Sequence, residues 1–288
     1  MSLLEQIAKR VEEKPIPSMV AFQLLKVIED DDHSLKEVIN LVANDASLTA
    51  EVLKVSNSAT YYRGQPVTTV NRAVQLLGEM MVVGVAICAS SSVVFNSPLE
   101  GYESVAGEMW EHSLRCAISA REIAKHSKKN MSHGLAFTAG LLHDIGKSVI
   151  SEFLVGSSED MTQLCESGAV QDYIEAERKI VGTDHAQVGY SLAKHWRLPD
   201  TLCVGIRDHH RPSEAIKEHR PLVYAVHLAD LISQLGGSGT GCDSLAYRVD
   251  TNYEEYFPLD RDAMALILLK IEEDFNSIKD MLMSDRKV

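Results

Sequence analysis

The sequence predicts an all-α protein built from two helical lobes. Apolar residues recur at helical spacing along most of the 288-residue chain. The two-residue alternation typical of half-buried strands is scarce. Leu, Ala, Val, Ile, Glu and Lys predominate, and this mixture favours helix. Clusters of Pro, Gly, Ser and Asn interrupt the pattern and mark where helices end.

The first lobe is expected to cover residues 1–98. Its predicted helices are 2–13, 18–30, 34–43, 45–57, 68–77 and 79–93. Pro15 stops the first helix because proline cannot continue a helix from its interior. Ser34 and Glu37 form a capping box that starts the third. Asp45 can cap the fourth with its carboxylate.

The second lobe is expected to cover residues 99–288, after a cluster of helix breakers at 95–101. Its predicted helices are 103–127, 132–155, 158–168, 170–180, 184–195, 200–209, 219–235 and 261–283. The glycine-rich segment 236–241 is predicted to be a flexible loop. Asp260 can cap the last helix.

Composition limits the partners of the protein. The net charge of −13 repels a phosphate backbone, so we expect no binding to nucleic acid. Metal ions could still supply local positive charge for a phosphate substrate. The most apolar run, 80–89, is too short to cross a bilayer, and no signal-peptide pattern opens the chain. We therefore expect no membrane association and a cytoplasmic protein.

The cysteines predict no disulfide framework and no cysteine-based zinc site. Their number is odd, at five, and no two have CxxC spacing. Buried free thiols in a reducing cytosol are the expected state.

Candidate metal ligands, histidines and carboxylates, occur at five places in the second lobe. The first two lie between residues 108 and 147. Glu108 and His112 are four residues apart, which puts them on one helical face where they can converge on an ion. His143 and Asp144 are adjacent, so on a helix their side chains diverge by about 100°. Both can serve metals if they project into a space between helices. Lys147, one turn later, can reach a phosphate or carboxylate as a point charge.

Three further places add to this set. His185 is expected on the first turn of a helix that one of the two preceding residues caps. His209 and His210, near a helix end, can address two ions, or one can bind metal while the other meets a substrate. His227 and Asp230 share a helical face. Asp230 is a candidate ligand, and His227 is either a partner behind the ligands or a core histidine.

These residues predict two divalent transition-metal ions. The candidate ligands are Glu108, His112, His143, Asp144, His185, His209, His210 and Asp230. Imidazole with carboxylate suits iron, manganese, zinc or nickel, and we favour iron or manganese. The set is too large for one ion, which indicates two ions about 3.5–4 Å apart. Such a pair can polarise a phosphoryl group and generate hydroxide at neutral pH.

The order His112, His143-Asp144, Asp230 resembles the HD superfamily of metal-dependent phosphohydrolases. Their core is a helical bundle with a H…HD…D ligand set. The remaining candidate ligands look like the expanded set of HD-GYP cyclic-di-GMP phosphodiesterases. That resemblance implies that Asp144 bridges the metals and that Lys147 contacts the substrate, so these two residues are our catalytic candidates. The HRPSE sequence at 210–214 lacks the Gly-Tyr-Pro signature of HD-GYP proteins.

The first lobe resembles a different family, HDOD. The motifs that carry this resemblance are PIPS at 15–18, NDASL at 44–48, VSNSA at 55–59 and AxxxLG at 73–78. HDOD modules are HD-related helical domains of bacterial signalling, and the resemblance extends from about residue 15 to 235. Its members commonly lack much of the metal set and are viewed as non-catalytic output or scaffold modules. This sequence departs from them by keeping His143-Asp144 and its partners.

Three functional hypotheses follow. The first is an HDOD-type bacterial signalling protein whose dinuclear site hydrolyses a phosphoester or cyclic nucleotide, with a phosphate-containing small molecule as substrate. The second is a non-catalytic signal-output or scaffold module, in which the metal is structural or sensing and the first lobe contacts a signalling protein. The third is a metal-dependent oxygenase similar to some HD-fold di-iron enzymes.

Overall fold

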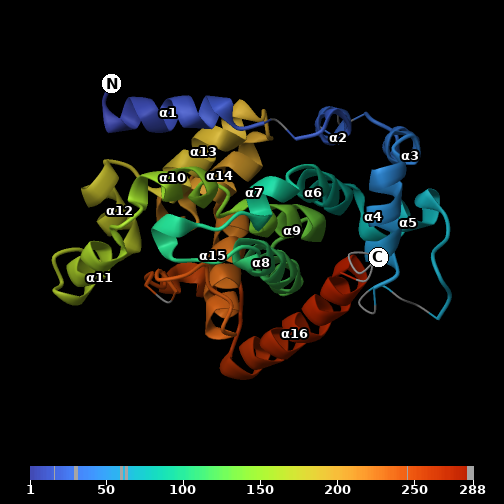
Figure 1. The fold of residues 1–288 in the computed structure, drawn as a ribbon. Helices are drawn as coiled ribbons and strands as arrows, with labels where there is room; N and C mark the ends of the chain where they lie inside the picture. The colour runs from blue at the N-terminus through green and yellow to red at the C-terminus, as the bar shows by residue number, and fades with distance from the viewer. Residues whose placement is uncertain (16, 29–31, 59–60, 62–63, 245, 284–288) are drawn as a thin grey trace.

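The structure, a computed structural model, describes residues 1–15, 17–28, 32–58, 61, 64–244 and 246–283. Over these residues it consists of helices without a β-strand, as the sequence predicts (Figure 1). The α-helices are α1 (Leu3–Glu13), α2 (Met19–Ile28), α3 (Leu35–Ala43), α4 (Ala46–Ser56), α5 (Val70–Leu77), α6 (Glu79–Ser90), α7 (Ser92–Asn96), α8 (Glu108–Ala124), α9 (His133–Leu142), α10 (Lys147–Leu154), α11 (Ser158–Glu166), α12 (Tyr173–Val181), α13 (His185–His195), α14 (Asp200–Asp208), α15 (Arg220–Leu235) and α16 (Arg261–Met283). The predicted helix 18–30 extends into residues 29 and 30, which lie outside the described residues.

Side-chain caps start several of these helices where the sequence predicts them. Asp45 accepts a hydrogen bond from the Leu48 amide at 2.8 Å and begins α4. Asp260 does the same for α16, accepting from the Ala263 amide at 2.8 Å. Asp184 caps α13 and leaves the next residue as the first of that helix. Each cap satisfies an amide that has no partner within its own helix.

Two predicted helices are wrong as single elements. The predicted helix 79–93 is divided at Ser91 between α6 and α7, and the predicted helix 132–155 is divided as well. The chain leaves α9 at Leu142 and starts α10 at Lys147, with a turn at 143–146. Gly146 lies so close to α13 that a Cβ there would be 2.0 Å from the His185 carbonyl oxygen. The approach of α10 to α13 therefore redirects the chain at this point, and hydrophobic periodicity does not report it.

The helices α8, α9 and α15 form the centre of the second lobe. α8 packs along both α9 and α15, and α14 contacts α9, α13 and α15. Gly140 lets α9 approach α8 closely, because a Cβ there would be 2.7 Å from the Cys116 carbonyl oxygen. Backbones this close allow side chains from several helices to meet in one small volume.

The helices α2–α6 form the body of the first lobe. It rests on the second lobe through α6 against α9, where the Thr138 hydroxyl donates to the Met80 carbonyl oxygen at 2.6 Å. α16 runs back from the second lobe to contact α4 (Figure 1). The division at residues 98 and 99 stays a prediction.

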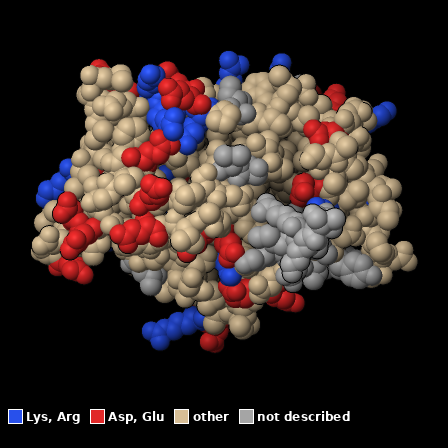
Figure 2. Space-filling view, viewed as in Figure 1, with Lys and Arg blue, Asp and Glu red and all other residues tan. Residues whose placement is uncertain are grey.

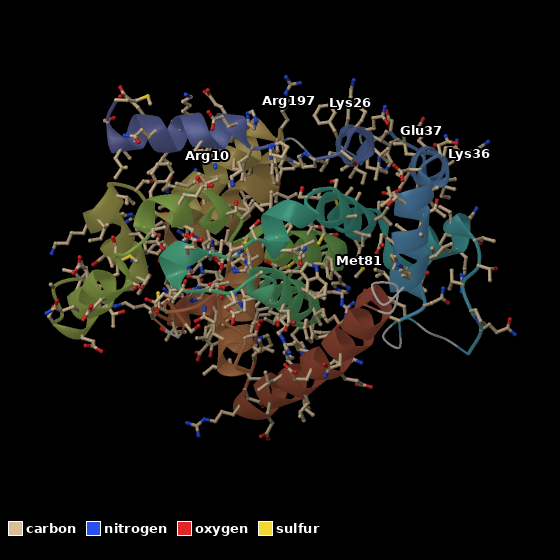
Figure 3. All side chains as sticks on the ribbon, in the orientation of Figure 1. Arg10, Lys26, Lys36, Glu37, Met81 and Arg197 are labelled. Carbon is tan, nitrogen blue, oxygen red and sulfur yellow. The ribbon has the colours of Figure 1, made fainter. Side chains whose placement is uncertain are left out.

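The first helix, α1, packs against the second lobe. It contacts α13 and α10. Arg10, on the side of α1 toward α10, forms a two-pronged ion pair with Glu152 at 2.7 and 3.1 Å (Figure 3). Helix α1 therefore joins the elements of the second lobe although it precedes the first lobe in sequence.

The surface carries both signs of charge. On the face shown in Figure 2, acidic and basic side chains are interspersed among the residues drawn in colour and form no continuous basic stripe. Within the described part of the chain, no single helix is both long and apolar enough to cross a membrane. α5 and α6 reach that length only as a pair, and they are bent by 107° at their junction.

Candidate metal centre

The helices of the second lobe bring seven of the eight predicted metal ligands into one buried cluster. α8, the turn after α9, the start of α13, the end of α14 and the middle of α15 each contribute. The members are His112, His143, Asp144, His185, His209, His210 and Asp230. Each is at most 5% exposed.

Four of these histidines are oriented by an acceptor at Nδ1. The pairs are His112 with the Ser238 carbonyl (2.7 Å), His143 with the Gly140 carbonyl (2.8 Å), His209 with the Ile206 carbonyl (2.7 Å) and His185 with the Glu177 carboxylate (2.9 Å). Because carbonyl and carboxylate oxygens only accept, each Nδ1 carries the proton. In the neutral form of each ring, Nε2 then carries a lone pair, and it faces the interior of the cluster.

The first ligand group contains His112, Cys116, His143 and Asp230. The Nε2 atom of His112 lies 3.4 Å from that of His143 and 3.2 Å from Asp230 Oδ1. A tetrahedral ion with metal–nitrogen and metal–oxygen bonds of about 2.0–2.2 Å holds such atoms about 3.3–3.5 Å apart. The spacing of this group is therefore that of a metal site.

The second ligand group contains Asp144, His185, His209 and His210. The Nε2 atoms of His185 and His210 are 3.0 Å apart, and Asp144 Oδ1 lies 3.4 Å from His185 Nε2. His209 Nε2 is 3.7 Å from the same oxygen. Two unprotonated nitrogens this close repel each other unless a cation or a proton lies between them.

Asp144 lies between the two groups and offers one oxygen to each. Its Oδ2 is 3.6 Å from His112 Nε2 and 3.5 Å from His143 Nε2, whereas its Oδ1 faces the second group. Among the described residues, neither Oδ1 nor His209 Nε2 has a hydrogen-bond partner, although both are buried. A buried polar atom without a partner is costly. A metal ion in each group would satisfy both, so these residues fit a pair of ions.

The electrostatics favour the protonation state that a metal ligand needs at Asp144, His209 and His210, but not at His112 or His185. Burial would lower the pKa of both of these histidines, but Cys116 and Asp230 hold the pKa of His112 well above its ordinary value, and Glu177 raises that of His185. Burial alone would raise the pKa of Asp144, but the charges of His143 and Lys147 outweigh it and hold that pKa well below its ordinary value. Burial lowers the pKa of His209 to about 4 and that of His210 well below its ordinary value. A carboxylate with neutral imidazoles is the state that binds a divalent ion.

Lys147 is buried within a network of its own. Its Nζ lies 2.7 Å from Asp144 Oδ2, 2.6 Å from Asp243 Oδ2 and 2.7 Å from the Thr240 hydroxyl. The ammonium group donates to Asp243 and Thr240, and Asp144 is an ion-pair neighbour. The structure thus places Lys147 against protein acceptors, and its predicted contact with a substrate stays a prediction.

The loop predicted to be flexible covers this cluster. Thr240 and Asp243 are 2% and 1% exposed, and the Ser238 carbonyl accepts from His112. Glycine content alone suggested mobility. The polar residues within the loop are the one sequence signal that it packs against a polar site.

Two candidates lie at the margin of the cluster. Glu108 belongs to neither ligand group; its carboxylate accepts from the Ser104 hydroxyl (2.7 Å) and the Val105 amide (3.0 Å) at the start of α8. His227 donates from Nδ1 to the His209 carbonyl at 2.8 Å, while its Nε2 accepts from the Asp250 amide. His227 therefore supports the backbone of a ligand rather than facing an ion.

Sequence reasoning missed two members of the site. Cys116 follows His112 by four residues, so helical spacing could have included it. Glu177, the acceptor that orients His185, lies eight residues before that histidine in a different helix. No local sequence pattern connects those two positions.

Known proteins resemble this chain in sequence. A family model described as the HDOD domain matches residues 15–212. An uncharacterized protein of Treponema pallidum (strain Nichols) is 26% identical over 234 residues, which cover 80% of this chain and 44% of that protein. The chain thus spans less than half the length of this curated relative.

Solved structures share the fold. An HDOD domain protein of unknown function from Geobacter sulfurreducens has a TM-score of 0.65 at 23% identity, covering 98% of this chain and 95% of the other. A protein from Shewanella amazonensis SB2B, provisionally described as a phosphohydrolase, has a TM-score of 0.68 at 25% identity, covering 96% and 97%. One from Marinobacter aquaeolei VT8, provisionally described as a signal transduction protein, has a TM-score of 0.70 at 21% identity, covering 97% and 64%.

Proposed function

This chain belongs to the HDOD family, and we propose that it is a signalling protein of that family in which the buried cluster holds two divalent transition-metal ions. Iron or manganese is favoured, with zinc or nickel as alternatives, because the ligands are mostly imidazole and carboxylate. One ion would be held by His112, His143 and Asp230, and the other by His185, His209 and His210.

The position of Asp144 carries this proposal. It offers Oδ2 to the first group and Oδ1 to the second, at 3.4–3.7 Å from the facing histidine nitrogens. A single-ion site would need only one of these oxygens. A carboxylate shared in this way is typical of paired ions about 3.5–4 Å apart.

The first candidate activity is hydrolysis of a phosphoester, with a phosphate-containing small molecule such as a cyclic nucleotide as substrate. Two bound ions would polarise the phosphoryl group and supply a nucleophile from water at neutral pH. Asp144 would hold both ions in register. Lys147 would bind a phosphate oxygen after exchanging Asp243 and Thr240 for the substrate.

The second candidate is a non-catalytic output or scaffold module, with the ions structural or sensing and the first lobe contacting a signalling partner. The burial of the cluster favours it. Every ligand is at most 5% exposed, and Lys147 is 1% exposed among protein acceptors. A substrate that binds Lys147 would have to displace Thr240 and Asp243.

The experiment compares metal content and hydrolysis in the wild type and Asp144→Asn. Asp144→Asn should lower bound metal from about two ions per chain to one or fewer, because the amide cannot bridge. Asp274→Asn is the matched control, since Asp274 is also 1% exposed but pairs with Arg121 and lies outside both ligand groups.

Activity should be assayed on iron- and manganese-loaded protein against cyclic dinucleotides, nucleotides and a generic phosphodiester. Hydrolysis that Asp144→Asn abolishes and Asp274→Asn retains would support the enzyme. Inactivity of both metal forms with two ions bound would support the output module. Fewer than one ion per chain after purification without chelators would refute both.

A further inference from the structure

The first ligand group contains a residue that the H…HD…D pattern does not include, Cys116. We propose that Cys116 binds the first metal ion as a thiolate, giving that site one sulfur, two nitrogen and one oxygen donor. The second site would keep nitrogen and oxygen donors only. This inference rests on the proposed dinuclear site and specifies the chemistry of one half of it.

The distances within the group support sulfur as a ligand. Cys116 Sγ lies 3.4 Å from His112 Nε2, the nitrogen that faces the cluster. With metal–sulfur bonds of about 2.3 Å and metal–nitrogen bonds of about 2.0–2.1 Å, a tetrahedral ion places these two atoms about 3.5 Å apart. The same His112 nitrogen is 3.4 Å from His143 Nε2 and 3.2 Å from Asp230 Oδ1. Three donor atoms therefore lie at coordination-shell spacing from His112 Nε2, and all four lie within 4.8 Å of one another.

A second observation indicates a cation at this place. Asp144, 1% exposed, directs Oδ2 toward the same two histidines at 3.5–3.6 Å. Neither oxygen of Asp144 has a hydrogen-bond partner among the described residues; Lys147 is an ion-pair neighbour of Oδ2 outside hydrogen-bonding geometry. The cysteine group thus borders a buried carboxylate that has no hydrogen-bond donor, on the side where the two histidines face it.

The alternative role for Cys116 is an ordinary buried thiol. Another acceptor, the Ala229 carbonyl oxygen, is 3.9 Å from Sγ, which is long even for a bond that involves sulfur. The contact with His112 is shorter. A thiol that served packing alone would not need to lie beside the one nitrogen of His112 that faces the ligands.

The consequence is that the two sites prefer different metals. A thiolate selects thiophilic ions such as zinc or ferrous iron, whereas imidazole with carboxylate also accepts manganese. The first site should then bind more tightly than the second and retain a thiophilic ion that the second exchanges. This refines the expectation drawn from nitrogen and oxygen ligands alone.

The test is titration of metal-free full-length protein with Co²⁺, followed by absorption spectroscopy. A sulfur-to-cobalt charge-transfer band in the near ultraviolet should grow with the first equivalent and stop growing at the second. Cys116→Ser should lose this band and bind the first equivalent at least about tenfold more weakly, since even residues behind a ligand typically contribute 10–100-fold. Cys203→Ser is the matched control, because Cys203 is equally buried but donates to the Leu198 carbonyl.

The outcomes separate this inference from the proposed function. A band that Cys203→Ser keeps and Cys116→Ser loses supports the thiolate ligand. Two equivalents of cobalt bound by the wild type without a charge-transfer band overturn it, while the dinuclear site stands. No cobalt bound by the wild type overturns both. The wild-type spectrum decides even if Cys116→Ser does not fold, because, of the two ligand groups found among the described residues, only the first contains a cysteine.

Discussion

At the scale of the residue, the neighbours of each histidine determine what it can do. Glu177 is the clearest case, because its buried carboxylate accepts from the Tyr102 hydroxyl (2.6 Å), the His185 amide (2.7 Å) and His185 Nδ1 (2.9 Å). These contacts fix both the backbone and the ring of His185. Glu177, which does not face an ion, therefore determines how His185 is oriented in the second ligand group.

Glu177→Gln should weaken the second metal site. The amide keeps one acceptor oxygen and turns an NH₂ group toward groups that already donate. We expect the second ion to bind about 10–100-fold more weakly and the first to be unaffected. Competition with a chelator during metal titration measures both affinities. Glu175→Gln, on the same helix, should change neither, because Glu175 accepts from the Gln171 amide and belongs to neither ligand group. Equal affinities for Glu177→Gln and wild type would contradict this role.

The sequence predicted the site residues whose side-chain types stand out in the chain. It missed Cys116 and Glu177, which only the three-dimensional structure places at the site. His143-Asp144 and His209-His210 are unusual enough side by side to indicate a site. Cys116 resembles any core cysteine, and Glu177 any helical glutamate. Cys116 lies one turn from His112 on α8, and Glu177 meets His185 only because α12 lies near α13. Glu108 had the right spacing, but it begins its helix and its carboxylate is used there.

At the scale of the element, the break between α9 and α10 produces the site. Adjacent residues on a continuous helix diverge, whereas the turn at 143–146 lets His143 and Asp144 both face the cluster. The turn depends on Gly146, whose missing side chain gives α10 room beside α13. Helical periodicity predicts both helices but not the turn, because the cause of the turn lies in a distant segment.

Gly146→Ala should destabilise the protein and displace His185. The added Cβ would lie 2.0 Å from the His185 carbonyl oxygen and 2.4 Å from the Gly189 amide nitrogen. Because both atoms are backbone, the helices must separate, at a cost of about 1–3 kcal/mol. Urea denaturation of the metal-free protein gives the free energy of unfolding.

Gly205→Ala is the control, and it should change the free energy of unfolding in the opposite direction. Gly205 lies inside α14, and a Cβ there would lie 3.6 Å from that of Ala139, an ordinary contact. Removing glycine from a helix should then stabilise by about 0.5–1 kcal/mol. If Gly146→Ala left the free energy of unfolding within about 0.5 kcal/mol of wild type, the close approach of α10 and α13 would not be what determines the turn.

At the scale of the whole molecule, chain order and spatial order differ. The sequence indicates a boundary near residue 98 because helix breakers gather there. Helix α1, on one side of that boundary, packs on α10 and α13 of the other, and α16 returns to α4. Breakers mark where a helix stops, but the apolar faces of α1 and α16 determine where those helices dock.

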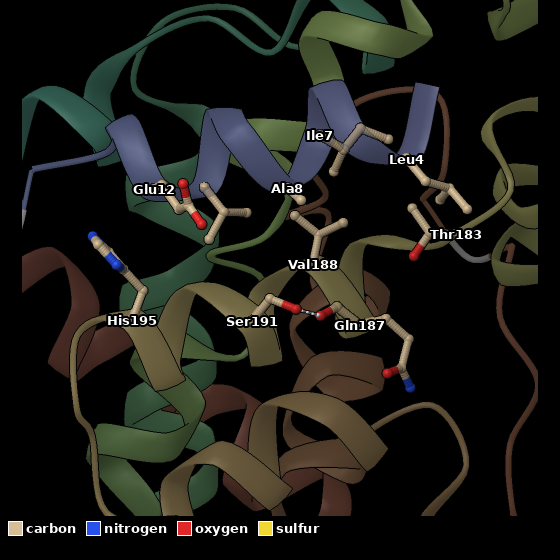
Figure 4. Close-up of a pocket in the computed structure, with 10 residues that line it drawn as sticks. Leu4, Ile7, Ala8, Glu12, Thr183, Gln187, Val188, Ser191 and His195 are labelled. Atoms are coloured by element: carbon tan, nitrogen blue, oxygen red, sulfur yellow. Dashed lines mark hydrogen bonds between the residues drawn. The ribbon is translucent and has the colours of Figure 1, made fainter. Parts of the chain in front are cut away.

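The docking of α1 predicts which of its residues stabilise the second lobe. Ile7 and Val11 are buried, whereas Leu4 is 50% exposed. Ile7 and Leu4 both line a pocket of about 590 Å³ between α1 and α13, opposite Val188 (Figure 4). Because water can enter this open pocket, Ile7→Ala should lose mainly the transfer free energy of its side chain, about 2 kcal/mol. Leu4→Ala should change stability by less than about 0.5 kcal/mol. Urea denaturation followed by circular dichroism measures both, and metal content should be unchanged because neither residue contacts a ligand group. If Ile7→Ala cost no more than Leu4→Ala, α1 would not be part of the second lobe in solution.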